Sequence, residues 1–252
     1  MLHERPVSAS AASSDTRPDV DPTTRLLLAG SLVILTGLAW SWTVRASAMP
    51  DCHVAGLPSF LLMWTVMMAA MMFPAIIPVV LAFTVFSRGR AAHPGAAATV
   101  FVAGYLIVWS LLGLPAYALL GGAAWLMGAA PPLAAVATPL GGTVLIACGV
   151  YQLTPLKDAC LRHCRVPQLF LAHHWRDGLG GALRLGAHHG LYCAGCCVSI
   201  MIVLLIVGVM NLGWMVALSA LIYLEKVLPG GRLAGRLAGV ALGGAGVLRI
   251  VT

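Results

Sequence analysis

Long apolar runs alternate with short polar segments along most of the chain. About 20 apolar residues in a helix cross roughly 30 Å of hydrocarbon, and no alternating strand pattern suggests a barrel. The pattern therefore predicts an all-α, polytopic transmembrane helix bundle. We expect about seven spans, at residues 26–44, 59–83, 98–120, 139–155, 194–211, 213–228 and 233–251.

Three connecting features complete this prediction. The apolar stretch from Ala123 to Met127, which precedes Pro131-Pro132, is interpreted as an interfacial or re-entrant piece. Asn211-Leu212-Gly213 interrupts one long apolar run and predicts a tight hairpin between the fifth and sixth spans. A cytoplasmic segment that contains Cys and His residues is expected at about 156–193.

The first 25 residues are rich in Ser, Ala, Asp and Pro, which predicts a disordered cytoplasmic tail before a transmembrane domain at 26–252. Ala46-Ser47-Ala48 resembles a signal-peptide cleavage site. The apolar run before it is longer than a usual signal core and follows an acid-containing tail, so we favour a retained anchor.

Composition and charge support a membrane protein. The 252 residues are 60% hydrophobic and 9% charged, with a mean hydropathy of +0.93, whereas soluble domains carry about 25% charged residues. With the N-terminus in the cytoplasm, the predicted inner segments hold 13 Lys and Arg residues and the outer ones hold 2. This asymmetry predicts a multi-pass protein of the bacterial inner (plasma) membrane and explains the net charge of +7 without a nucleic-acid partner.

Methionines crowd the second predicted span. Met63, Met67 and Met71 recur at every fourth residue, and Met68 and Met72 form a second row beside them. A methionine stripe most often fills a core, but this density, together with the cysteines and histidines of the chain, suggests ligands for a soft metal.

Two cysteine motifs lie on the predicted inner side. In Cys160-Leu161-Arg162-His163-Cys164, two thiols share a helix face, His163 lies three residues after Cys160, and the arginines favour the thiolate form. The alternative is two small residues on an interfacial helix.

Cys193-Ala194-Gly195-Cys196-Cys197 is the stronger motif. Cys193, Cys197 and Met201 follow one another at every fourth position, so sulfur atoms line one helix face. Three thiols in five residues indicate a metal site more than simple packing, and cytosolic thiols stay reduced.

Further candidate ligands flank these motifs. Cys52 and His53, with Met49, lie in the predicted outer loop. His188 and His189 precede the second cysteine motif, and His189 is the candidate that we retain. His173 and His174 are interpreted as a solvated polar face.

This donor set predicts Cu(I) as the bound metal and leaves another soft or borderline metal open. No acidic residue lies in the middle of a span, as a proton relay or hard-cation path would require. Glu225-Lys226, near the inner end of the sixth span, is interpreted as a local pair or anchor. A P-loop and a catalytic constellation are both missing from the sequence, which favours a protein that is not an enzyme.

Small residues mark the last span. Gly231, Gly235, Gly239 and Gly243 recur at intervals of four, which predicts close helix packing. The same face is where we expect contact with a second copy or with a larger membrane complex.

Four stretches resemble a family of bacterial integral membrane proteins, described as predicted metal-binding and sometimes labelled copper chaperones. They are Met63-Trp64 to Met71-Met72-Phe73-Pro74, Tyr151-Gln152-Leu153-Thr154-Pro155-Leu156-Lys157 to Arg165, His189-Gly190 to Met201, and Gly208-Val209-Met210-Asn211 to Glu225-Lys226. Family members often have Trp after the double Cys, where this chain has Val198. The resemblance implies metal binding without fixing the metal.

The leading hypothesis is a membrane protein that binds Cu(I) and passes it on by ligand exchange, as a chaperone or transport accessory. One alternative is a membrane thiol–disulfide or electron relay that uses Cys193, Cys196 and Cys197. The other is a structural or assembly subunit in which the sulfur residues have no ligand role.

Overall fold

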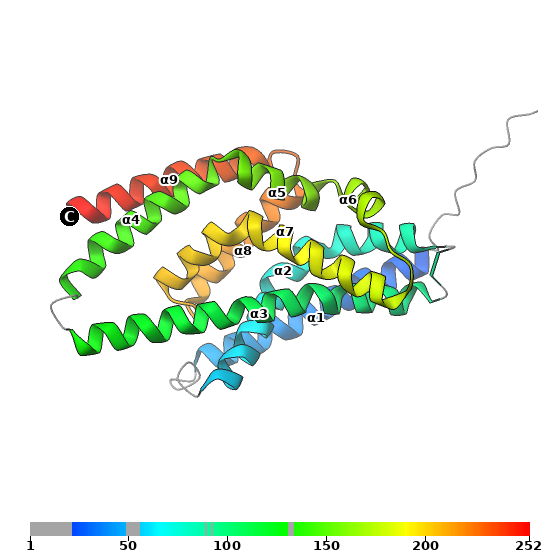
Figure 1. Cartoon of the computed structure of the whole chain (residues 1–252), viewed down its shortest axis with the longest axis horizontal. Helices are drawn as coiled ribbons and strands as arrows, with labels where there is room; N and C mark the ends of the chain where they lie inside the picture. Colours follow the sequence, from blue (N-terminus) through cyan, green and yellow to red (C-terminus); the bar gives the residue numbers. More distant parts are fainter. Residues whose placement is uncertain (1–21, 49–55, 89, 92, 131–133) are drawn as a thin grey trace, which may run out of the picture.

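The computed structural model describes residues 22–48, 56–88, 90–91, 93–130 and 134–252 (Figure 1). These residues form helices throughout, which confirms the all-α prediction. The helices are α1 (Pro22–Ser47), α2 (Leu57–Ser87), α3 (Pro94–Ala129), α4 (Ala134–Gln152), α5 (Pro155–Arg165), α6 (Pro167–His174), α7 (Gly178–Val207), α8 (Leu212–Val227) and α9 (Gly231–Val251).

The predicted spans correspond to α1, α2, α3, α4, α7, α8 and α9. Within the described residues, five helices are long and apolar enough to cross a membrane: α1, α2, α3, α7 and α9. Helices α4 and α5 meet at a bend of 59° and pass the same test only as a pair. Helix α8 has 16 residues and is shorter than these spans. The total of seven spans therefore stays a prediction.

Several helix boundaries differ from the expected ones. The stretch Ala123–Met127 is not a separate piece, because α3 continues through it to Ala129. Helix α7 begins at Gly178, so the second half of the expected inner segment is part of a long helix. Hydropathy marks where the apolar run begins, at about residue 194. The more polar turns from Gly178 onward extend the same helix before that run.

Helix α7 lies at the centre of the arrangement, with α3 along one side and α5 across it (Figure 1). Helix α1 packs on α2, and α4 pairs with α9. Glycines let α3 and α7 approach backbone to backbone: a Cβ at Gly104 would lie 3.0 Å from the Ala187 nitrogen, and one at Gly190 would lie 3.0 Å from Val108 Cβ. This close contact places the side chains of the two helices within hydrogen-bond reach of each other.

The glycine face of α9 is used inside the chain. A Cβ at Gly239 would meet Gln152 Cβ at 2.9 Å, and one at Gly149 would meet the Gly243 nitrogen at 2.8 Å. The predicted helix packing is therefore present, between α9 and α4. Contact with a second copy through this face stays a prediction that these contacts do not support.

A buried ion pair joins α5 to the end of α8. Lys157 Nζ lies 2.7 Å from Glu225 Oε1, and the two side chains are 2% and 1% exposed. Lys157 also contacts Gln152 Oε1 at the end of α4. Arg165 donates from Nη1 to the carbonyl oxygen of Glu225 at 2.6 Å. The interpretation of Glu225-Lys226 as a local pair is thus wrong, because each side chain has a distant partner.

Candidate functional site

All five methionines of α2 are buried in the helix bundle. Met63, Met67, Met68, Met71 and Met72 belong to one apolar core shared with α3, α7 and α8. The helix continues through Pro74 and Pro78 to Ser87, so the methionine rows lie well inside α2. Buried thioethers can contact other protein groups, which a lipid-facing stripe could not do.

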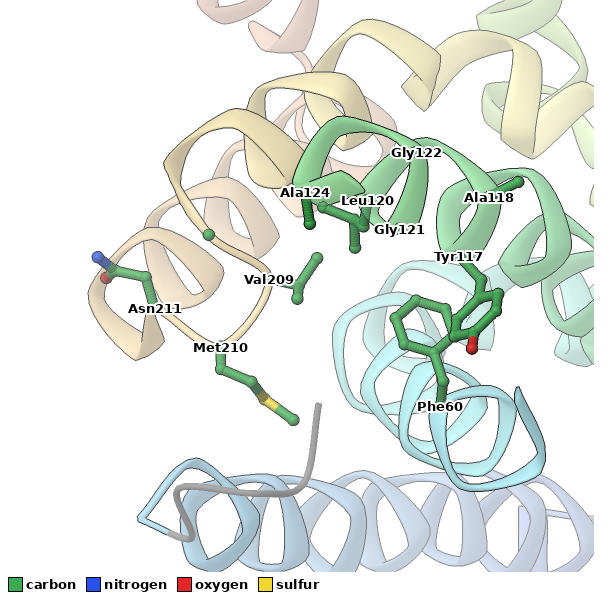
Figure 2. Close-up of a pocket in the computed structure, with 11 residues that line it drawn as sticks. Phe60, Tyr117, Ala118, Leu120, Gly121, Gly122, Ala124, Val209, Met210 and Asn211 are labelled. Carbon is green, nitrogen blue, oxygen red and sulfur yellow. The ribbon is translucent and has the colours of Figure 1, made fainter. Parts of the chain in front are cut away.

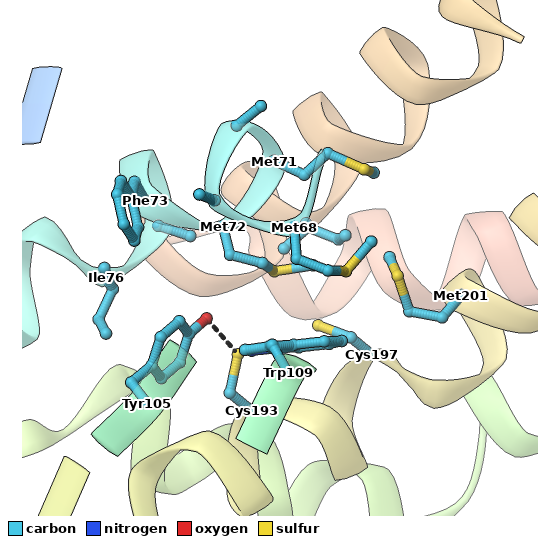
Figure 3. Close-up of a cluster of buried hydrophobic side chains, with 14 of the residues drawn as sticks. Met68, Met71, Met72, Phe73, Ile76, Tyr105, Trp109, Cys193, Cys197 and Met201 are labelled. Atoms are coloured by element: carbon cyan, nitrogen blue, oxygen red, sulfur yellow. Dashed lines mark hydrogen bonds between the residues drawn. The ribbon is translucent and has the colours of Figure 1, made fainter. Parts of the chain in front are cut away.

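The two methionine rows face different neighbours. Figure 3 shows Met68 and Met72 extending toward Cys197 and Met201 of α7, whereas Met71 lies farther from Cys197. The Met71 carbonyl oxygen accepts a hydrogen bond from Ser219 Oγ of α8 at 3.3 Å. Of the three methionines labelled there, Met68 and Met72 therefore lie nearer to Cys197 than Met71 does.

Helices α5 and α7 bring thiols from both cysteine motifs together. Cys164 Sγ lies 3.9 Å from Cys196 Sγ, which in turn lies 3.6 Å from Cys197 Sγ. Cys196 also donates to the Cys193 carbonyl oxygen at 3.1 Å. All four side chains are buried, and none of the four forms a disulfide. We call Cys164, Cys193, Cys196 and Cys197 the thiol cluster.

Cys193 has two polar partners that the sequence analysis did not assign to the site. Lys226 Nζ donates to Cys193 Sγ at 2.9 Å, and Tyr105 Oη lies 3.0 Å from the same sulfur (Figure 3). Lys226 is 7% exposed. A buried ammonium requires an anionic or strongly polar partner, so this contact stabilises Cys193 as a thiolate.

Cys160 lies against Gly195 of α7, whereas His163 lies against an aromatic ring. A Cβ at Gly195 would lie 2.8 Å from Cys160 Sγ, so the missing side chain lets α5 lie against α7. Tyr151 Oη donates to the Gly195 carbonyl oxygen at 2.7 Å. The His163 ring instead stacks on Tyr192, with ring centroids 3.9 Å apart.

His189 is buried one helical turn before Cys193. Its ring lies among those of Phe101, Tyr105 and Phe170, with centroids 6.0, 6.0 and 5.4 Å away. Its Nδ1 atom has no hydrogen-bond partner among the described residues. A buried ring nitrogen without a partner is unusual, and a ligand would satisfy it.

The remaining predicted ligands cannot be placed. Met49, Cys52 and His53 lie outside the described residues. Within the part of the chain that the structure covers, no group of three or more His, Cys, Asp or Glu side chains has the arrangement of a metal site. The predicted ligand set therefore stays a prediction. The structure does bring together two pairs of thiols, Cys164 with Cys196 and Cys196 with Cys197.

Two apolar pockets lie beside these elements. A pocket of about 720 Å³ between α3 and the α7–α8 turn is lined by Phe60, Tyr117 and Met210 and holds none of the predicted ligands (Figure 2). A groove of about 400 Å³ is lined by Trp64, Trp109 and Val198. Val198, where family members often have Trp, is exposed and is not one of the four cysteines of the thiol cluster.

The fold and the site together define an all-helical protein with membrane-length apolar helices and a buried cluster of thiols. A family model described as "Copper chaperone", PpoB2, matches residues 61–249. The chain therefore belongs to this copper chaperone family, as the sequence resemblance predicted. Searches of curated proteins and of solved structures give no match.

Proposed function

We propose that this protein is an integral membrane copper chaperone that binds Cu(I) at the thiol cluster and passes it on by ligand exchange. The observation that carries the proposal is the meeting of Cys164 from α5 with Cys196 and Cys197 from α7. Thiolate and thioether ligands select Cu(I) over harder ions. Membership of the copper chaperone family supports the same metal.

The sulfur separations suit a shared metal ion. Two sulfurs that bind one ion at 2.3 Å with tetrahedral angles, the geometry known from zinc–thiolate sites, lie about 3.8 Å apart. The observed Sγ–Sγ distances are 3.9 Å for Cys164–Cys196 and 3.6 Å for Cys196–Cys197. Small rotations of these side chains would therefore be enough for two of them to share one ion.

Lys226 balances the charge of such a site. Two thiolates and one Cu(I) ion carry a net charge of −1, which is costly inside a buried cluster. The Lys226 ammonium, 2.9 Å from Cys193 Sγ, supplies the compensating positive charge. Glu225 does not neutralise this lysine, because its carboxylate is paired with Lys157.

The thioethers of neighbouring methionines would provide further sulfur ligands for Cu(I) beside the thiol cluster. Met68 and Met72 point from α2 toward Cys197 and Met201 (Figure 3). A thioether binds Cu(I) without a charge change, so the ion can move between thioether and thiolate in small steps. Copper stays Cu(I) throughout, and the transfer needs no catalytic base.

Metal analysis tests this function. The full chain, purified in detergent without oxygen, is loaded with Cu(I) and freed of excess ion, and the bound copper is measured. We expect stoichiometric copper in the wild type and in Cys148→Ser, whose buried thiol lies on α4 outside the cluster. Loss of the bound copper is expected in the double variant Cys164→Ser and Cys196→Ser. Full copper retention in the double variant would refute the proposal.

A further inference from the structure

A basic pocket lies where α6 ends and α7 begins, away from the thiol cluster. It has a volume of about 320 Å³, and Arg176, Arg184 and Trp175 form part of its wall. Three histidines complete the polar lining: His173, His174 and His188. The proposed function uses none of these residues.

The charges of this pocket favour an anion. Its lining residues include two guanidinium groups and no carboxylate. The nearby Asp177 is engaged, because its Oδ1 accepts a hydrogen bond from Trp175 Nε1 at 2.8 Å. The His174 and His188 rings, 4.9 Å apart, would suit a metal cation by themselves, but two arginines beside them oppose one. Arginine is the residue best suited to bind phosphate oxygens.

A second pocket adjoins the first and is largely apolar. It has a volume of about 580 Å³ and shares His173 and His174 with the basic pocket. Its other lining residues are Arg162, His163, Val166, Leu169 and Phe170. A polar, positively charged pocket therefore continues into one with a largely apolar wall, which Arg162 and His163 also line. A phospholipid matches this arrangement, because its charged phosphate group is joined to apolar acyl chains.

The position along α7 suits the membrane surface. Its 30 residues extend about 45 Å at 1.5 Å per residue, more than the roughly 30 Å of hydrocarbon. The Gly178 end, with Arg184 on the helix and Arg176 just before it, lies on the side that the positive-inside rule assigns to the cytoplasm. Basic pockets beside transmembrane helices on that side bind anionic lipid headgroups.

We propose that the joined pockets bind one anionic phospholipid, with its phosphate between Arg176 and Arg184 and an acyl chain along Val166, Leu169 and Phe170. The bound lipid would hold α5, α6 and the start of α7 together. This proposal does not depend on copper binding, because it uses different residues.

Lipid retention tests the proposal. The full chain is incorporated into nanodiscs of equimolar phosphatidylglycerol and phosphatidylcholine, released into detergent, and the retained lipids are counted by native mass spectrometry. We expect phosphatidylglycerol to be retained selectively. Each of Arg176→Gln and Arg184→Gln should lower that retention about five-fold, as expected for one basic residue at an anionic surface. The matched control is Arg236→Gln, an exposed arginine of α9 on the same side.

A second measurement separates the lipid from free phosphate. Thermal unfolding is followed with added phosphatidylglycerol or with inorganic phosphate. We expect the lipid to stabilise the wild type and not the Arg176→Gln, Arg184→Gln double variant, while phosphate alone has a much smaller effect. Equal retention in wild type and double variant would overturn the proposal, and so would an equal response to phosphate. Copper binding by the double variant should equal that of the wild type, which keeps this test separate from the proposed function.

Discussion

Lys226 and Cys193 form a buried contact of 2.9 Å between the end of α8 and the middle of α7. The ammonium stabilises negative charge on the sulfur, and Tyr105 Oη contacts the same sulfur at 3.0 Å. This relationship makes the thiol cluster more than a group of small buried residues, because a buried cation has to be matched by an anion. It also leads to the first prediction.

Replacing Lys226 by Met should weaken Cu(I) binding. A hydrogen bond to a charged group contributes about 1.5–3 kcal/mol, which corresponds to roughly ten- to a hundred-fold in affinity. Competition with a chromogenic Cu(I) chelator under anaerobic conditions measures the effect. Lys226→Arg, which keeps the charge, should lose less affinity, and equal losses in both variants would contradict the charge argument.

The two methionine rows should differ in their effect on copper. Met68→Leu and Met72→Leu are expected to lower Cu(I) affinity about ten-fold or more, in the range seen when groups around a metal site are altered. Met71→Leu is the matched control, because Met71 lies farther from Cys197 than Met68 and Met72 do (Figure 3). Leucine nearly conserves volume, so all three variants should fold. An effect confined to Met71→Leu would show that the other row binds the ion.

Breaking the Lys157–Glu225 pair should destabilise the fold. Removing one partner of a buried ion pair leaves an uncompensated charge and costs about 3–5 kcal/mol. Glu225→Ala should therefore lower the thermal unfolding temperature markedly in detergent. The double variant Lys157→Met, Glu225→Leu should recover much of the loss, since no charge remains buried alone. Failure of the double variant to recover any stability would argue against this explanation.

Close approach of α3 and α7 should depend on Gly104. Its Cβ would lie 3.0 Å from the Ala187 nitrogen, and crowding of this kind costs about 1–3 kcal/mol. Gly104→Ala should lower the unfolding temperature and weaken Cu(I) binding, because Tyr105 would move away from Cys193. Gly121→Ala, on the same helix with nothing within 4 Å, should be neutral or stabilising. Equal behaviour of the two variants would refute this role for Gly104.

The helices and the methionine rows could be predicted from the sequence because they depend on local periodicity. A break near Asn211 was also predicted, but it lies at 208–211, because α7 ends at Val207 and Leu212 and Gly213 belong to α8. The Asn211 side chain accepts a hydrogen bond from the Trp214 nitrogen at 3.2 Å and caps α8. The start of α7 was missed, since hydropathy marks apolar runs and not the polar turns that extend a helix.

The polar partners of the thiols could not be predicted. Lys226 lies 33 residues after Cys193, and only the packing of α8 against α7 brings them together. The sequence suggested that Glu225 and Lys226 pair with each other, because neighbouring opposite charges usually suggest a local pair. Identifying their real partners requires the tertiary arrangement of α5, α7 and α8.

The ligands of bound copper provide the most direct test of the central claim, that buried sulfur atoms of α5 and α7 hold Cu(I). X-ray absorption at the copper edge, recorded on the anaerobically loaded full chain, reports the atoms in the first shell. We predict a shell dominated by sulfur, which loses sulfur scattering in Cys196→Ser and stays unchanged in Cys148→Ser. A shell made of nitrogen and oxygen alone would contradict the claim.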